Sequence, residues 1–471
     1  MIKPREVFDR VEEWTSLDRF VRAPGDRTRF GIVYGRRRQG KSWLLERLAE
    51  RASGWYWEAI EGTSRQQLDR FAAYFRAVTK LSVLPRFDDW SGALDAIWAA
   101  KPRVVVLDEF QYLVDAAPEL PSVLQTRVSR AGGPRVIACG SALGAMRGLL
   151  ATGAPLRGRA SLELLVGPFD FRTAATYWGV GRAWETAVML HALVGGTPAY
   201  LDFASGRTPR TFDSFEDWVR DVLLDPAGAL FREGRIVIDE PSLRDRGFYL
   251  GILSAVASGR TRRGQIAATL GRPDNTLAHA LNALVELALL ERVDDPLHAR
   301  RSFFRLAEPL VRTHQVLIAP NERAIERRGA RRVWQYIATT AVTQIYGPHF
   351  EHLAREWVAR HASEKTLGGV PRFVGQSVAS DPAAKREWEI DVIAESGGTV
   401  LALGEAKWSK GPVGVSVLHG LEHRRSLLGS RAGGAKLLLF ARAGFDAELR
   451  RSARTRRDIE LVDLERMYRG E

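Results

Sequence analysis

Hydrophobic residues near the N-terminal end form short apolar runs that alternate with amphipathic segments. The run FGIVY predicts a buried strand ending before Gly35, and four apolar side chains between Leu44 and Ala52 then recur on one side of a helix. Strands that are apolar throughout are typical of parallel sheets covered on both faces. The pattern therefore predicts an α/β fold with a central parallel sheet. The other elements expected here are helices over 7–21 and 66–78, a turn at 24–26, and strands over 54–60, 103–107, 134–141 and 162–169.

The loop between that first strand and its helix fits the template G-x-x-x-x-G-K-[ST]. In such P-loops, backbone N–H groups wrap a polyphosphate at a helix N-terminus, the lysine reaches the β- and γ-phosphates, and the hydroxyl binds Mg²⁺. An ordinary glycine-containing loop is the alternative, but the flanking strand and helix favour nucleotide binding. The candidate nucleotide-binding residues are Gly35, Arg36, Arg37, Arg38, Gln39, Gly40, Lys41 and Ser42, of which Ser42 is also a candidate Mg²⁺ ligand.

Two later strands end in polar residues that suit ATP hydrolysis. The segment RVVVLDE ends in Asp108 and Glu109, a Walker B pattern in which Asp108 holds the Mg²⁺ shell and Glu109 activates the attacking water. The segment PRVIACGS ends at Ser141. In P-loop ATPases with a strand inserted between the two Walker strands, a polar residue here senses the γ-phosphate. A simple strand-ending turn is the alternative role for Ser141.

The segment PLRGR follows with Arg157 and Arg159. An arginine at this point could reach the γ-phosphate of a neighbouring subunit as an arginine finger, which requires a homo-oligomer or a closed cleft between domains. The alternative is a solvated arginine in a loop. Which of the two arginines acts at the nucleotide stays open.

Several of these segments together resemble a known family. YGRRRQGKSWLL, VVVLDEFQYL, ACGSALGAM, PLRGR with GPF, and GGTPAYL at 195–201 are similar to the archaeal-type ATPases, an AAA-like group related to the STAND signalling NTPases. The resemblance covers about residues 5–205. It implies ATP and Mg²⁺ as cofactors, ATP hydrolysis as the activity, and a helical lid in which Pro198 lies near the adenine. The family's N-terminal box, F-x-x-R-x-x-E-L, is matched only loosely by FDRVEEW at 8–14.

Downstream of the ATPase-like part, the pattern predicts a helical connector over 208–225 and then a helix-turn-helix. We expect helices over 246–258, from 263 to the break at Gly271, and over 275–290. Short strands over 291–293 and 302–306 would form a β-wing with Arg300 and Arg301 at its base. The layout is typical of a winged helix.

The outward face of the second helix would carry Thr276, His279 and Asn282, with Arg272 nearby. These side chains suit phosphates and base edges, so we expect DNA contact there. A lid or packing element is the alternative. The arginine-rich segment 321–332 either tracks a phosphate backbone or is a solvated linker.

The last part of the chain has its own candidate chemistry. A helix begins at Phe350 and Glu351, and EIDVIA and TVLALGEAKW predict two strands. Asp391, Glu405 and Lys407 form the pattern D-x₁₃-E-x-K. Such carboxylates bind Mg²⁺, which activates water and polarises a phosphate, while the lysine stabilises negative charge. The segment resembles the PD-(D/E)XK nuclease superfamily and the nuclease-like domain that accompanies this ATPase family. The resemblance implies catalytic roles for Asp391, Glu405 and Lys407 and a metal site at Glu351, Asp391 and Glu405.

The connection between these two strands decides whether Asp391 and Glu405 point to the same side of the sheet. With a two-residue turn at Gly397 and Gly398, Asp391 would pair with Gly404 and point away from Glu405. A three-residue loop places Asp391 opposite Glu405. We therefore predict an odd loop or a β-bulge.

Composition limits the partners and the cellular location that we expect for the protein. The formal net charge is +13, which favours polyanionic partners such as DNA, although a basic proteome would produce the same bias. A single cysteine excludes a disulfide framework and a cysteine zinc cluster. The sequence lacks an apolar run of the roughly 18 residues that span a bilayer and lacks a signal-peptide core. We expect no membrane partner and a cytoplasmic location.

Together these patterns predict three parts in the 471-residue chain. Residues 1–205 would form an AAA-like P-loop ATPase domain with an all-α lid, 206–330 a connector and winged helix, and 331–471 an α/β restriction-endonuclease-like domain. The expected function is an ATPase that couples nucleotide binding or hydrolysis to DNA binding and metal-dependent DNA cleavage. The alternative is a STAND-like nucleotide switch whose C-terminal fold binds DNA or protein without cleaving.

Overall fold

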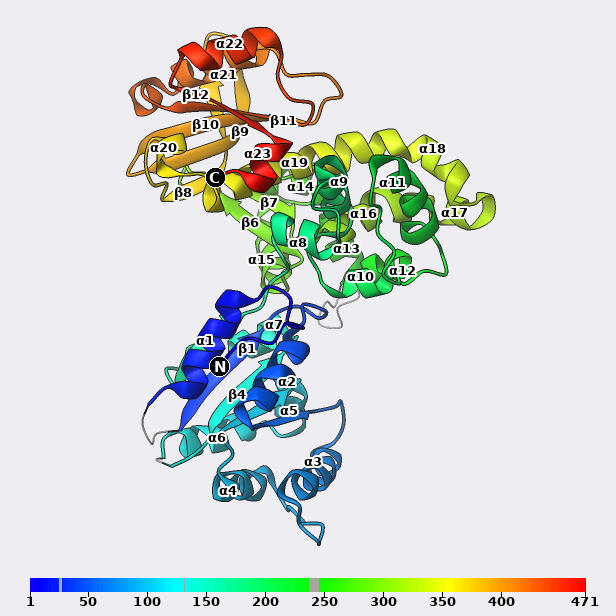
Figure 1. Cartoon of the computed structure of the whole chain (residues 1–471), viewed down its shortest axis with the longest axis vertical. Coiled ribbons are helices and arrows are strands. Elements are labelled where there is room, and N and C mark those ends of the chain that lie inside the picture. The colour runs from blue at the N-terminus through cyan, green and yellow to red at the C-terminus, as the bar shows by residue number, and fades with distance from the viewer. Residues whose placement is uncertain (25–27, 131, 237–244) are drawn as a thin grey trace. The chain divides into compact units, whose positions relative to one another are not determined.

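A computed structural model describes residues 1–24, 28–130, 132–236 and 245–471 of the chain. The chain divides into two compact units, Met1–Pro168 and Phe169–Glu471 (Figure 1). Part of the turn expected at 24–26 lies outside the described residues. No helix in the described ranges combines the length and the apolar character needed to cross a membrane.

The first unit is built on a five-stranded parallel sheet with the order β2-β3-β4-β1-β5. The α/β fold with a central parallel sheet is thus confirmed. Strand β4 lies between β1 and β3, as expected for the inserted strand. The strands are β1 (Arg29–Tyr34), β2 (Trp55–Glu58), β3 (Val104–Asp108), β4 (Arg135–Gly140) and β5 (Ala160–Leu165). The helices are α1 (Val11–Arg22), α2 (Lys41–Ala52), α3 (Ser64–Thr79), α4 (Trp90–Ala100), α5 (Phe110–Ala116), α6 (Leu120–Val128) and α7 (Leu143–Gly148).

Two expected boundaries in this unit are wrong. The first helix begins at Val11 rather than at residue 7, because Asp9 and Arg10 both adopt φ near 52°, outside the helical region. Strand β5 ends at Leu165, three residues before Pro168. A proline lacks the N–H that would continue the ladder.

The second unit begins with helices. These are α8 (Phe171–Tyr177), α9 (Trp184–Val194), α10 (Ala199–Phe203), α11 (Phe212–Trp218) and α12 (Ala229–Ile236). After a gap in the described residues come α13 (Arg246–Ala257), α14 (Arg263–Leu270) and α15 (Leu277–Glu286), then an antiparallel hairpin of β6 (Leu290–Asp294) and β7 (Ser302–Leu306). Gly271, which ends α14, has φ 61°, a left-handed value that glycine adopts without strain.

The rest of the unit carries a mixed five-stranded sheet with the order β12-β11-β10-β9-β8. Strands β8, β9 and β10 pair antiparallel, and β10, β11 and β12 pair parallel. These strands are β8 (Phe373–Asp381), β9 (Arg386–Ser396), β10 (Thr399–Lys407), β11 (Lys436–Ala441) and β12 (Ile459–Asp463). The helices are α16 (Pro309–Thr313), α17 (Glu322–Arg328), α18 (Ala330–Ala341), α19 (Gly347–Arg360), α20 (Glu364–Leu367), α21 (Val415–Leu427), α22 (Ala447–Thr455) and α23 (Leu464–Arg469).

A large hydrophobic core extends through much of the second unit. It runs from Phe171 and Val188 in the first helices, through Trp334 and Trp357, to Phe440 in the C-terminal sheet. The helices α8, α9 and α10, which the sequence analysis assigned to the first domain, therefore pack in one core with the C-terminal sheet. The three-part division expected from the sequence stays a prediction.

Two buried histidines tie this core together. Nδ1 of His191 on α9 lies 2.8 Å from Nε2 of His349 on α19, and burial lowers the pKa of His191 to about 4. The unfolded chain therefore binds more protons between pH 6.5 and 4, so native stability is full above pH 6.5 and is lost as the pH falls through this window.

We expect the free energy of unfolding of the wild type to fall by roughly 2 kcal/mol more between pH 7 and pH 5 than that of a His191→Gln variant. Urea unfolding at the two pH values checks this. His279 on α15 is exposed, so His279→Gln is the matched control and should keep the wild-type pH dependence. Equal pH dependence of all three proteins would contradict the assignment.

Candidate functional site

The predicted P-loop connects the end of β1 to the start of α2. Gly35 lies so close to β5 that a Cβ there would meet the Val166 carbonyl oxygen at 2.1 Å, so only glycine fits. Gly40 is the N-cap of α2 with φ 81°. The N-terminal N–H groups of α2 therefore point out of a left-handed turn, a geometry that binds anions.

Lys41 is buried and lies at the first position of α2. Its Nζ donates to the Arg36 carbonyl oxygen at 2.9 Å, across the loop. Burial lowers the pKa of Lys41, and the nearby Cys139, Glu109 and Asp108 act in the opposite direction. A buried ammonium group inside a loop of backbone donors fits a polyphosphate.

The predicted Walker B and sensor residues lie close together at the carboxyl ends of β3 and β4. Asp108 is 1% exposed and accepts from the Glu109 N–H at 2.8 Å. The hydroxyl of Ser141 donates to the Glu109 carboxylate at 3.1 Å, and the Gln111 amide donates to the same carboxylate. Ser141 thus contacts Glu109, the residue expected to activate water, and its predicted contact with the γ-phosphate stays a prediction.

Tyr56 on β2 is a site residue that the sequence did not indicate. Its hydroxyl donates to Oδ2 of Asp108 at 2.5 Å and also interacts with Ser42. Burial is the main cause that raises the pKa of Tyr56, and the negative charge of Asp108 raises it further. The hydroxyl therefore lies with the two side chains predicted to hold Mg²⁺. The oxygens of Ser42 and Asp108 are the ligands that Mg²⁺ prefers, so this donor set fits the ion.

Arg10 lies in the loosely matched N-terminal box, and its contacts were not indicated by the sequence. It is buried, and its guanidinium donates to the Gln39 carbonyl oxygen in the P-loop at 3.0 Å and to the Gly167 carbonyl oxygen at 2.7 Å. It also pairs with Glu13 at 2.9 Å. Arg10 and Glu13 therefore occupy the R and E positions of the N-terminal box, with Val7 in the place of its phenylalanine. The Arg10 side chain thus links the N-terminal box to the backbone of the P-loop.

The structure says less about the remaining residues predicted to lie at the nucleotide site. Arg157 and Arg159 are exposed in the loop before β5, so their finger role depends on a partner and stays a prediction. Arg37 donates to the Tyr112 hydroxyl at 3.2 Å. Pro198 is the N-cap of α10 in the second unit, and its role near the adenine stays a prediction.

The C-terminal candidate site depends on the register between β9 and β10. Gly397 and Gly398 form a two-residue turn with positive φ at both positions, so a three-residue loop is wrong. A β-bulge between Val400 and Ala402 then shifts the register by one residue. Continuing the shifted register places Asp391 opposite Glu405, and Asp391 Oδ2 accepts from the Ala406 N–H at 2.9 Å. The predicted bulge is confirmed.

The acidic residues expected at this site are close enough to influence one another. Burial raises the pKa of Asp391 to about 8, and the charges of Glu351 and Glu405 add to the shift. Burial also raises the pKa of Glu351. Crowded, poorly solvated carboxylates are a donor set that suits a divalent cation.

The Glu405 carboxylate nevertheless forms ion pairs with two cationic side chains. Lys407 Nζ lies 2.5 Å from one carboxylate oxygen, and Arg424 on α21 lies 3.1 Å from the other. Among the residues that the structure describes, no group of three or more His, Cys, Asp or Glu side chains is arranged to hold a metal ion. The chemistry of the donor set fits Mg²⁺, but Glu405 has to exchange a cation partner before it can serve as a ligand. Arg424 was not indicated by the sequence.

Two family profiles match parts of the chain. Residues 7–202 match a family described as an ATPase domain predominantly from Archaea, and residues 315–420 match one described as archaeal and bacterial proteins of unknown function. An uncharacterized protein of Methanocaldococcus jannaschii is 25% identical over 333 residues, which cover 68% of this chain and 70% of that protein. An ATPase-like domain thus occupies the N-terminal part, and a second, uncharacterised domain lies toward the C-terminus.

Solved structures similar to this chain include two ATPase-like proteins. A Walker-type ATPase of Pyrococcus abyssi is 22% identical, with a TM-score of 0.50, over 67% of this chain and 99% of that chain. The ORC2 protein of Aeropyrum pernix, solved as ADPNP–ADP complexes, is 17% identical, with a TM-score of 0.42, over 72% of this chain and 97% of that chain. The likeness to the Pyrococcus protein shows a Walker-type ATPase fold.

Proposed function

We propose that this chain is an ATP-dependent protein that senses or processes DNA. ATP binds and is hydrolysed in the first unit, and the state of the nucleotide controls how the second unit engages DNA. The observation that carries the proposal is the meeting of Lys41, Asp108, Glu109 and Ser141 at the carboxyl ends of neighbouring parallel strands. Ligands of open α/β sheets bind at such strand ends.

Each residue has a separate role in this proposal. Lys41 leaves the Arg36 carbonyl and binds the β- and γ-phosphates, while Ser42 and Asp108 hold Mg²⁺. Bound Mg²⁺ neutralises charge that develops on the phosphates. Glu109 orients the attacking water and accepts its proton, and Ser141 keeps the Glu109 carboxylate in place.

DNA is the proposed partner of the second unit. The helices α13, α14 and α15 with the β6–β7 hairpin follow the order of a winged helix, and the chain carries a net charge of +13.

The bulge that aligns Asp391 with Glu405 favours a metal-dependent phosphodiesterase centre in the C-terminal sheet. Asp391 and Glu405, with Glu351 behind them, would hold the ion, and Lys407 would stabilise charge on the phosphate. The pairing of Glu405 with Lys407 and Arg424 favours the alternative, a nucleotide switch whose nuclease-like fold does not cleave. DNA cleavage by the wild type separates the two.

A Glu109→Gln variant tests the coupling. We expect ATP hydrolysis to fall by roughly 100-fold or more because the general base is lost, while ATP binding is retained. The variant is then held in its ATP state, and its affinity for DNA should differ from that of the ADP-bound protein. Fluorescence anisotropy with labelled DNA measures this difference.

Asp115→Asn is the matched control because Asp115 is exposed on the same helix, α5. It should hydrolyse ATP at the wild-type rate. DNA affinity that is the same with ATP, with ADP and without nucleotide would refute the proposed coupling.

A further inference from the structure

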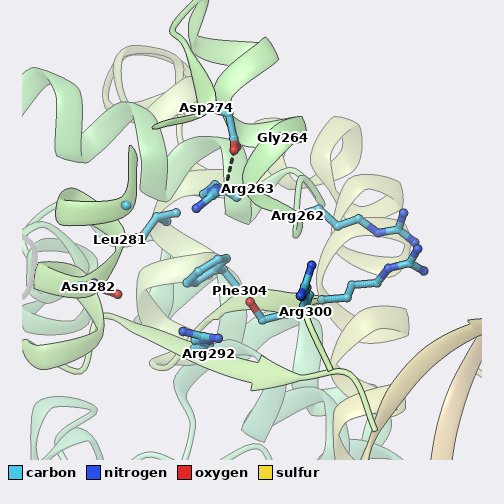
Figure 2. A pocket seen from close by; sticks show the side chains of 12 residues that line it. Arg262, Arg263, Gly264, Asp274, Leu281, Asn282, Arg292, Arg300 and Phe304 are labelled. Carbon is cyan, nitrogen blue, oxygen red and sulfur yellow. Dashed lines mark ion pairs between the residues drawn. The ribbon is translucent and has the colours of Figure 1, made fainter. Parts of the chain in front are cut away.

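An open cavity of about 480 Å³ lies among α14, α15 and the β6–β7 hairpin (Figure 2). Its volume falls in the range of small-ligand sites. Of the described residues that line it, only Asp274 is acidic, and it pairs with Arg263 at 2.6 Å. The basic lining residues are Arg262, Arg263, Arg292, Arg300 and Arg301. The cavity therefore carries an excess of positive charge.

The lining also has an apolar part. Phe304 and Leu281 contribute apolar side chains, and Asn282 contributes an amide. Figure 2 shows the Phe304 ring between the guanidinium groups of Arg263 and Arg292 in this view. Phe304 is 5% exposed and Leu281 1% exposed, so the apolar area that faces the cavity is small. Guanidinium groups bind phosphate oxygens through paired N–H donors, and aromatic surfaces accept bases or sugars. This combination matches a nucleotide better than it matches a bare anion.

Two of these arginines already hold an anionic group. Glu387 on β9 accepts from Arg262 Nη1 at 3.2 Å on one oxygen and from Arg301 Nη2 at 3.1 Å on the other. Burial is the largest single effect on the pKa of Glu387 and raises it, but the two arginines together outweigh burial and lower this pKa below its usual range. The other terminal nitrogen of Arg301, Nη1, is buried with no hydrogen-bond partner among the described residues. Arg262 and Arg301 together thus have an N–H donor that the Glu387 carboxylate does not use.

We propose that this cavity binds a phosphate-bearing nucleotide unit of a DNA strand, in competition with Glu387. The phosphate takes the place of the carboxylate between Arg262 and Arg301, and the sugar or base lies against Phe304. Exposed Arg300 and half-exposed Arg292 meet the neighbouring phosphates, which a strand has and a free mononucleotide lacks. The site shares Asn282 with the outward face predicted for DNA contact, but Thr276 and His279 of that face do not line it. It rests on the proposed DNA binding and specifies where one nucleotide is held.

The test uses the full chain carrying Lys41→Ala, so that the P-loop does not contribute nucleotide binding. Anisotropy with a labelled oligothymidylate at two salt concentrations gives the affinity and its salt dependence. We expect Arg300→Ala to weaken binding roughly three- to tenfold and to reduce the salt slope by about one, and Glu387→Gln to tighten binding by a similar factor. Arg210→Ala and Glu448→Gln are matched controls at exposed positions outside the cavity.

Competition by thymidine monophosphate identifies the source of the nucleotide. If thymidine monophosphate does not displace the bound oligonucleotide, the result supports a DNA strand as the ligand. Displacement of the oligonucleotide by the monophosphate at low concentration would show a free-nucleotide site and overturn the strand assignment. If DNA binds but Glu387→Gln behaves like Glu448→Gln and Arg300→Ala like Arg210→Ala, the cavity proposal is overturned while DNA binding stands. If neither ligand binds, the cavity proposal and the proposed DNA binding both fail.

Discussion

A Lys41→Ala variant is expected to bind ATP at least ~100-fold more weakly than the wild type and to show no ATP turnover. The buried ammonium group makes charge-assisted contacts to phosphate, and each such contact contributes roughly 1.5–3 kcal/mol. In the structure its partner is a single loop carbonyl, so the substitution removes a ligand contact without breaking an ion pair at its Nζ. Isothermal titration calorimetry with Mg²⁺-ATP measures the affinity.

Arg51→Ala is the matched control for that variant. Arg51 lies at the exposed end of the same helix, α2. The Arg51→Ala substitution therefore removes one positive charge and leaves the P-loop unchanged. This variant should bind ATP like the wild type. Equal ATP affinity of Lys41→Ala and the wild type, with both proteins folded by circular dichroism, would eliminate the P-loop assignment.

An Asp391→Asn variant is expected to lose DNA cleavage by roughly 1000-fold or more in Mg²⁺ or Mn²⁺. The amide cannot supply the negative charge that a divalent cation needs, while its oxygen can still accept from the Ala406 N–H, so the strand pairing should survive. Gel analysis of plasmid and oligonucleotide substrates measures cleavage, with EDTA to remove the metal.

Glu465→Gln, at an exposed position on α23, is the control for loss of one acidic charge. It should cut DNA at the wild-type rate. Equal cutting by the wild type and Asp391→Asn would point to a contaminating nuclease. A wild type that binds DNA and never cuts it would favour the switch, in which Lys407 and Arg424 keep Glu405 from acting as a metal ligand.

The parts of the fold that the sequence predicted best are those carried by local patterns. The apolar runs before Gly35, Asp108 and Ser141 gave the parallel strands, and β4 lies between β1 and β3 as expected. The bulge in β10 could be predicted because side chains alternate along a strand, so residue spacing alone shows that Asp391 and Glu405 need a register shift. The same reasoning could not tell a longer loop from a bulge after a two-residue turn.

The residues that sequence reasoning missed act over long separations in the chain. Arg10 reaches the backbone at Gln39 and Gly167, and Tyr56 reaches Asp108 from a neighbouring strand. Arg424 meets Glu405 only because α21 packs back over β10. Tyr56 and Arg424 belong to no short motif at fixed spacing, and Arg10 lies in a box whose sequence pattern does not give the contacts of its side chain. Tertiary packing brings each of them to its site.

Steady-state ATP turnover by the full chain with Mg²⁺, measured without DNA and with single-stranded, duplex and branched DNA, tests the proposed coupling most directly. We predict measurable hydrolysis by the wild type, a rate that changes at least severalfold with one of these DNA forms, and no hydrolysis by Lys41→Ala under any condition. Absence of hydrolysis by the wild type throughout, or one rate with and without every DNA form, would contradict an ATPase coupled to DNA.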